Sequence, residues 1–139
     1  MMIKANLAFC MNASALLIFL SGNVLGAEAE TFAERHQLAK LAEEQEPTRS
    51  YLNDKMFPAV GAAAATAMRD CLTPAGAGTE PFTVLADLSK DGNFTRIAYA
   101  PKTDTAACFA AAMPSFHAPP PPTQDGRPLP ISIDMKVIP

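Results

Sequence analysis

The sequence has little of what most functional classes require. Among its 139 residues there is no Trp, there are only two His and three Cys, and charged residues make up 18% of the chain. The net charge of −3 leaves no basic excess of the kind that nucleic-acid-binding proteins carry, so we expect no nucleic-acid partner. A chain of this length is expected to form one domain.

Familiar catalytic and metal-binding patterns are also missing. His36 and His117 lie far apart, and the sequence contains no H-E-x-x-H spacing, no G-x-S-x-G elbow and no glycine-rich phosphate-binding loop. Asp87 and Asp91 flank a predicted turn, and turn chemistry explains them better than acid–base pairing does. We therefore expect a protein that is not an enzyme and that holds no cofactor and no metal.

What the sequence does contain begins with an export signal. Residues 1–27 combine one early cation, Lys4, with an apolar stretch centred on residues 16–20 and small residues around Ala27 and Ala29. This layout is typical of a secretory signal peptide, cleaved after Ala27 or Ala29. A transmembrane anchor is the alternative, but the apolar stretch is short for a bilayer core of about 30 Å. We expect the mature protein in the periplasm, with secretion as the second choice and no permanent membrane anchor.

The odd number of cysteines is explained by the same segment. Cys10 lies within the predicted signal peptide, and the bulky Phe9 before it does not fit a lipoprotein signal. Removal of the signal leaves Cys71 and Cys108, and an even number of cysteines in an exported chain predicts a disulfide. A redox-active pair is the alternative, although catalytic dithiols are typically spaced as C-x-x-C.

Residues 28–50 form a charged leader between the signal and the domain. Thr31 is a suitable N-cap and Glu34 completes a capping box, which together indicate a short helix ending near Glu44. The apolar stripe of this helix is thin and holds Phe32, Leu38, Leu41 and Ala42. We therefore expect a frayed helix or a flexible segment here, and a folded domain over residues 51–139.

Alternation of apolar and polar residues predicts three strands. Two alternating runs flank the turn at residues 90–93, where Asp91-Gly92 predicts a β-hairpin over residues 82–100. A third run predicts a half-buried strand at residues 131–137, with Ser132, Asp134 and Lys136 on its solvated face. Its apolar face consists of Ile131, Ile133, Met135 and Val137.

Two helices complete the predicted domain. Residues 58–72 have helical spacing and begin with Pro58, and residues 103–113 form a second helix capped by Thr103 or Asp104. The predicted fold is α+β, with two helices packed on a small three-stranded antiparallel sheet in the order α-β-β-α-β and one disulfide between the helices. The prolines at 119–122 must be extended, as a surface connector or, alternatively, as a ligand for an aromatic groove.

The stretch from Phe82 to Val137 shows a characteristic series of features. These are a hairpin around Asp91-Gly92-Asn93-Phe94, a capped helix with Phe109, Phe116 followed by Pro119-Pro120, a closing strand at residues 131–137, and cysteines on both sides of the hairpin. This series resembles the C-terminal domain of TonB-type and TolA-type periplasmic proteins. The transducers of that family have a lasting membrane anchor and a long linker, whereas this chain has a cleavable signal and a short leader.

The resemblance implies a freestanding module that binds another envelope protein or peptide and is linked to TonB- or TolA-type transport. Such domains bind partners by strand addition at an exposed sheet edge. The candidate partner-binding strand comprises Ile131, Ser132, Ile133, Asp134, Met135, Lys136 and Val137. Two other hypotheses remain open, namely a small secreted enzyme or inhibitor with a site around His117 and the proline loop, and a structural accessory of the envelope held by the charged leader.

Overall fold

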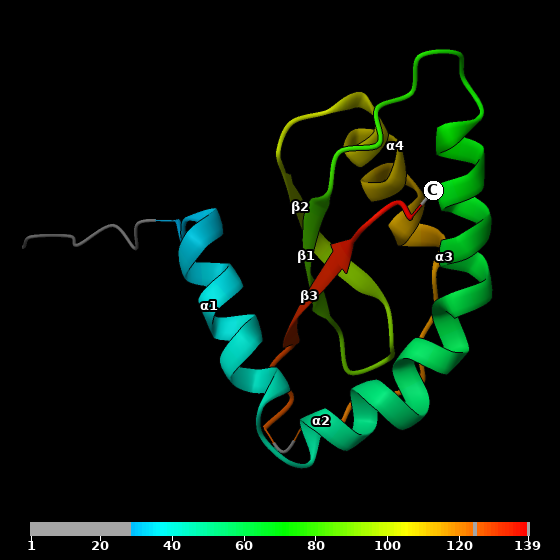
Figure 1. Cartoon of the computed structure of the whole chain (residues 1–139). Coiled ribbons are helices and arrows are strands. Elements are labelled where there is room, and N and C mark those ends of the chain that lie inside the picture. The colour runs from blue at the N-terminus through cyan, green and yellow to red at the C-terminus, as the bar shows by residue number, and fades with distance from the viewer. Residues whose placement is uncertain (1–28, 124, 139) are drawn as a thin grey trace, which may run out of the picture.

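A computed structural model describes residues 29–123 and 125–138, and Figure 1 shows how their elements are arranged. The predicted signal peptide at residues 1–27 lies outside the described residues. The elements, in chain order, are α1 (Phe32–Glu43), α2 (Thr48–Tyr51), the π-helical turn η1 (Leu52–Met56), α3 (Phe57–Leu72), β1 (Phe82–Leu88), β2 (Phe94–Ala100), α4 (Asp104–Ala112), the 3-10 turn η2 (Met113–Ser115) and β3 (Leu129–Met135).

The predicted three-stranded antiparallel sheet is present. Its strand order is β2-β1-β3, so β1 is central and both β2 and β3 are edge strands. The hairpin turn closes as predicted, with the Ser89 N–H donating to the Asn93 carbonyl at 2.9 Å. Gly92 has φ +88° in this turn, and a Cβ at this position would lie only 1.8 Å from the carbonyl oxygen of Ala118. Glycine is therefore required here for both its backbone conformation and its lack of a side chain.

The main core lies between the sheet and the helices that follow α2. Alternate residues of β1 point into it, as expected for a strand with one face on a core. They are Phe82, Val84, Ala86 and Leu88. Phe109 of α4 is fully buried at the centre and makes edge-to-face contacts with Phe82 and Phe116, with ring centroids 5.8 and 6.0 Å apart.

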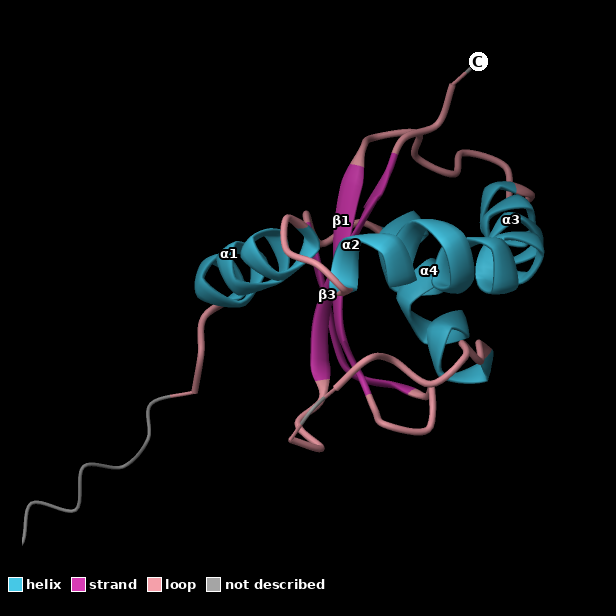
Figure 2. Cartoon of the chain, turned by 90° about the horizontal axis from the view of Figure 1, so that it is seen from below, coloured by secondary structure: helices cyan, strands magenta, loops and turns pink. Residues whose placement is uncertain are grey.

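The predicted order α-β-β-α-β matches the long elements of residues 57–135, but the leader contributes a third long helix, so the helix count and the order of the whole chain are not matched. The order of the long elements is α-α-β-β-α-β. In Figure 2, α1 lies on one side of the sheet, and α3 and α4 lie on the other. Residues 32–43 are therefore an ordered helix on the second face of the sheet, which the expectation of a frayed or flexible leader did not foresee. The capping box of Thr31 and Glu34 is present as predicted.

The helix predicted at residues 58–72 is α3, but helical backbone already begins at Thr48 and runs through η1 into α3. Pro58 explains the π-helical turn before it. Proline has no N–H to donate and its ring collides with the carbonyl four residues earlier in an α-helix, and a wider turn relieves that collision. The second predicted helix is α4, and Thr103 caps it by accepting the Ala106 N–H at 3.2 Å.

Candidate functional site

The predicted partner-binding strand lies at an edge of the sheet. The observed strand β3 runs from Leu129 to Met135, so it begins two residues before the predicted strand and ends before Lys136 and Val137. Ile131 lies in the core, and Ile133 and Met135 pack against it. The apolar face of the strand is therefore placed as its alternation predicted.

The outer edge of β3 is regular. All seven residues pair with β1 without a register shift. Pro130 has no N–H, so it fits a position at which the backbone N–H would point away from β1. Ser132 lies two residues further along and has the same orientation as Pro130. In Figure 1, β3 is the strand nearest the viewer, with α1 on one side and α3 on the other.

The other edge strand, β2, is irregular. Its pairing with β1 shifts register between Leu85 and Asp87, which marks a β-bulge. Arg96 at this point has φ +49°, in the left-handed region, and its carbonyl already accepts a hydrogen bond from Arg35 of α1 at 2.7 Å. A bulged edge whose carbonyl is occupied is a poor template for another strand. Of the two edges, β3 is the one with regular pairing.

The predicted solvated face of β3 is covered by α1 only in part: the Asp134 side chain remains 56% exposed, whereas the burial of Ser132 is a correction. Ser132 is only 4% exposed, and Asp134 accepts hydrogen bonds from Lys40 of α1 at 2.9 Å and from Thr83 at 2.7 Å. These hydrogen bonds lower the pKa of Asp134, and the Asp134 carboxylate raises the pKa of Lys40. Lys136 lies beyond the strand and is exposed, in agreement with the prediction.

Further charged contacts fix the first half of α1. Asp87 on β1 is only 7% exposed, and its carboxylate lies 3.5 Å from Arg35 of α1 and 2.9 Å from Arg96 of β2. Among the residues of α1, Ala39 is fully buried. Because α1 has little apolar surface to bury, its position on the sheet depends to a large extent on these polar contacts.

A pocket of about 320 Å³ lies beside the edge of β3. Its floor is formed by residues 132–134 of β3. The walls come from α1 on one side and from α2, η1 and the start of α3 on the other, through Lys40, Glu43, Arg49, Leu52, Asn53 and Phe57. Phe57 is 39% exposed and is one of the few large apolar side chains on the surface. The pocket therefore combines part of the β3 edge with an exposed aromatic ring.

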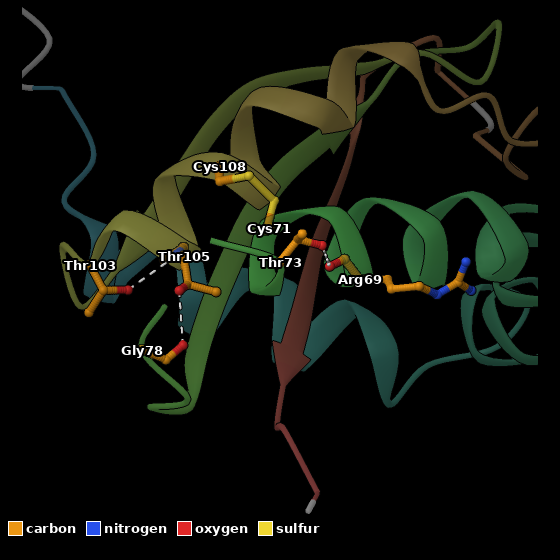
Figure 3. Close-up of a disulfide and its surroundings, with 8 residues drawn as sticks. Arg69, Cys71, Thr73, Gly78, Thr103, Thr105 and Cys108 are labelled. Atoms are coloured by element: carbon orange, nitrogen blue, oxygen red, sulfur yellow. Dashed lines mark hydrogen bonds between the residues drawn. A yellow bond between two sulfur atoms is a disulfide. The ribbon is translucent and has the colours of Figure 1, made fainter. Parts of the chain in front are cut away.

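The predicted disulfide joins Cys71 at the end of α3 to Cys108 in α4, with Cα atoms 5.7 Å apart (Figure 3). Next to it, the Thr105 hydroxyl donates to the carbonyl of Gly78 at 2.9 Å, which ties α4 to the loop after α3. The disulfide therefore links α3 and α4, the two helices that cover the core face of the sheet.

His117 lies beside the hairpin turn. Its Nδ1 is 3.2 Å from the amide oxygen of Asn93, and the two residues also form an isolated β-bridge. The proline segment that follows is held by Tyr51, whose hydroxyl donates to the carbonyl of Pro119 at 2.5 Å. Burial raises the pKa of Tyr51 to about 12. His117 is therefore an exposed residue bonded to the hairpin turn, and the proline segment is bonded to α2.

Sequence reasoning missed Glu43, Lys40 and Phe57 as residues of the candidate site. Glu43 and Lys40 were assigned to the leader, and Phe57 immediately precedes the predicted helix. Glu43 and Lys40 are three residues apart on a helix that has a capping box, so they share one side of it. That spacing predicts that the two side chains lie on the same side of the helix, but it does not predict which element they contact.

In the part of the chain that the structure describes, no helix is both long and apolar enough to cross a membrane. Within the same residues, no group of three or more His, Cys, Asp or Glu side chains is placed to hold a metal ion. No protein-family model, no curated protein and no solved structure matches this chain. The described residues therefore define the protein by its fold alone, an α+β domain with a three-stranded antiparallel sheet between helices and a disulfide.

Proposed function

We propose that the mature protein is an exported, periplasmic module of the cell envelope that binds another protein or peptide by strand addition to β3, and that it has no enzymatic activity. The observation that carries this proposal is the edge of β3, which is regular along its length and flanked by a pocket with an exposed aromatic ring. Main-chain hydrogen bonds along such an edge supply affinity, and the side-chain pocket supplies specificity.

Export and the disulfide support each other in this proposal. The signal sequence at residues 1–27 directs the chain to an oxidising compartment, and a disulfide persists in such a compartment. The link to TonB- or TolA-type transport rests on the resemblance of residues 82–137 to those C-terminal domains.

The test is to remove one edge N–H without changing the rest of the strand. Ser132→Pro removes the N–H, and Ser132→Ala keeps it and serves as the matched control. The Ser132 hydroxyl is buried without a hydrogen-bond partner, so the alanine variant should fold at least as well as the wild type. Circular dichroism and thermal melting establish that the proline variant is folded before it is used.

Each variant is immobilised and exposed to periplasmic extract, and bound proteins are identified by mass spectrometry. We expect the wild type and Ser132→Ala to retain the same protein and a folded Ser132→Pro to lose it. Equal retention by the proline variant would exclude strand addition at β3.

A further inference from the structure

The edge of β3 is already occupied at one position. The N–H of Ser132 donates to Oε1 of Glu43, the last residue of α1, at 3.3 Å. The two residues are 89 positions apart in sequence, so this is a tertiary contact. A carboxylate oxygen here takes the place that a backbone carbonyl of an added strand would take.

Lys40 holds the Glu43 carboxylate in that position. Its ammonium lies 3.2 Å from Oε2 of Glu43 and 2.9 Å from the carboxylate of Asp134. Lys40 and Asp134 are each substantially exposed in this cluster, and exposed ion pairs contribute little to stability. The cluster therefore orients the Glu43 carboxylate, and moving this carboxylate away costs little free energy.

The contact between Glu43 and Ser132 determines how many N–H groups of the β3 edge are free to pair with another strand. Pro130 offers no N–H, so Ser132 provides the first outward N–H of the strand. Proteins protect edge strands from unwanted pairing with prolines and charged side chains. Pro130 and Glu43 together protect the first half of the β3 edge from unwanted pairing.

The pocket beside this contact indicates what an incoming strand carries. Leu52 and the partly exposed ring of Phe57 provide apolar surface in the wall opposite α1. A strand whose carbonyl replaces the Glu43 carboxylate projects alternate side chains out of the sheet plane, toward the pocket walls. An apolar side chain fits the wall that holds Phe57.

We infer that Glu43 is a built-in competitor for the edge of β3, and that the partner is an extended segment whose backbone carbonyl displaces Glu43 from Ser132 and whose apolar side chain packs on Phe57. This inference rests on the function proposed above and adds its regulation. In the free protein the carboxylate guards the edge, and a matching strand displaces it.

Glu43→Ala tests the competition, and Glu44→Ala is the matched control because Glu44 is the next residue, carries the same charge and is exposed. The first readout needs no partner. NMR of the full mature chain measures the rate of amide hydrogen exchange at Ser132. This rate should become about tenfold faster in Glu43→Ala and stay unchanged in Glu44→Ala.

The second readout is binding of a defined probe, a labelled nine-residue peptide of alternating valine and threonine with phenylalanine at its centre. Fluorescence anisotropy should show roughly three- to tenfold tighter binding to Glu43→Ala than to Glu44→Ala or the wild type. Replacing the central phenylalanine with alanine, or Phe57 with alanine, should weaken that binding.

The outcomes separate this inference from the proposed function. If Ser132 exchange does not change, or if it quickens without tighter binding of the peptide, Glu43 does not compete for the edge and the inference is overturned. If binding persists when Ser132→Pro is added to Glu43→Ala, the peptide does not use the β3 edge, and the proposed strand addition fails as well.

Discussion

The Cys71–Cys108 disulfide should account for a large share of the stability of this small domain. The bond joins residues 37 positions apart in sequence. In the chain-entropy model, closing a loop of that length restricts the unfolded chain enough to stabilise the folded state by about 4 kcal/mol at 25 °C. Since the total stability of a small domain is about 5–15 kcal/mol, loss of the bond should remove between about a quarter and four fifths of it.

The measurement compares urea denaturation of the oxidised mature protein with that of the Cys71→Ala/Cys108→Ala variant. We expect the free energy of unfolding to fall by about 4 kcal/mol and the melting temperature by about 15 °C. The reduced wild type is the matched control, because it lacks the bond but keeps both sulfur atoms. It should unfold at nearly the same urea concentration as the double variant.

Two results would refute this reasoning. The first is a loss of less than about 1 kcal/mol in the double variant, which would mean that the unfolded chain is already compact between these residues. The second is the appearance of two titratable thiols in the purified, air-oxidised protein, which would mean that the bond does not form. Either result would leave packing between α3 and α4 as the main link between these helices.

Two further substitutions test contacts of the hairpin turn and the proline segment. Tyr51→Phe removes the hydrogen bond to the carbonyl of Pro119 and should lower the free energy of unfolding by about 1 kcal/mol in urea, with Tyr99→Phe as the control. The raised Tyr51 pKa adds stability that is fully present below pH 10 and is lost as the pH rises toward 12, so this alkaline loss should be absent in Tyr51→Phe. Gly92→Ala should cost more than 1 kcal/mol by the same assay, because φ is +88° and the new methyl group would collide with a loop carbonyl, and an unchanged midpoint would contradict this.

The parts of the fold that sequence reasoning predicted are those with a local pattern. Strict alternation at residues 131–137 and around the Asp91-Gly92 turn predicted the strands, since side chains of a strand alternate between two faces. The cysteine pair was predicted from its even number in an exported chain, and the structure confirms the bond. Each of these predictions needed only the identity of residues close in sequence or of one residue type.

The position of α1 had no such pattern. The apolar stripe of α1 is thin, and several of its contacts with the sheet are made by charged side chains, whose partners follow no sequence period. Arg35 meets Asp87 across 52 positions, and Lys40 meets Asp134 across 94. A thin stripe is typical of a weakly held helix, whereas in α1 it accompanies polar contacts with the second face of the sheet.

The candidate site depends on both kinds of information. Alternation predicted the strand at residues 131–137, but the sheet order that makes β3 an edge strand follows from long-range pairing with β1. The residues that flank the edge, Glu43 and Phe57, belong to helices before and after a bend in the chain. No local pattern connects them to a strand that lies so much later in the sequence.

Helices on both sides of the sheet restrict how this domain offers its backbone to a partner. With α1 on one face and α3 and α4 on the other, unpaired main-chain groups of the described sheet remain at its two edges (Figure 2). The bulge and the Arg35 contact disrupt the β2 edge. At the β3 edge, the backbone is regular, Pro130 lacks an N–H, and the Ser132 N–H is bonded to the Glu43 carboxylate, which a rotation of that side chain would release. A hydrogen bond from a side chain can be replaced by one from an added strand, and for that reason β3 is the edge at which we propose partner binding.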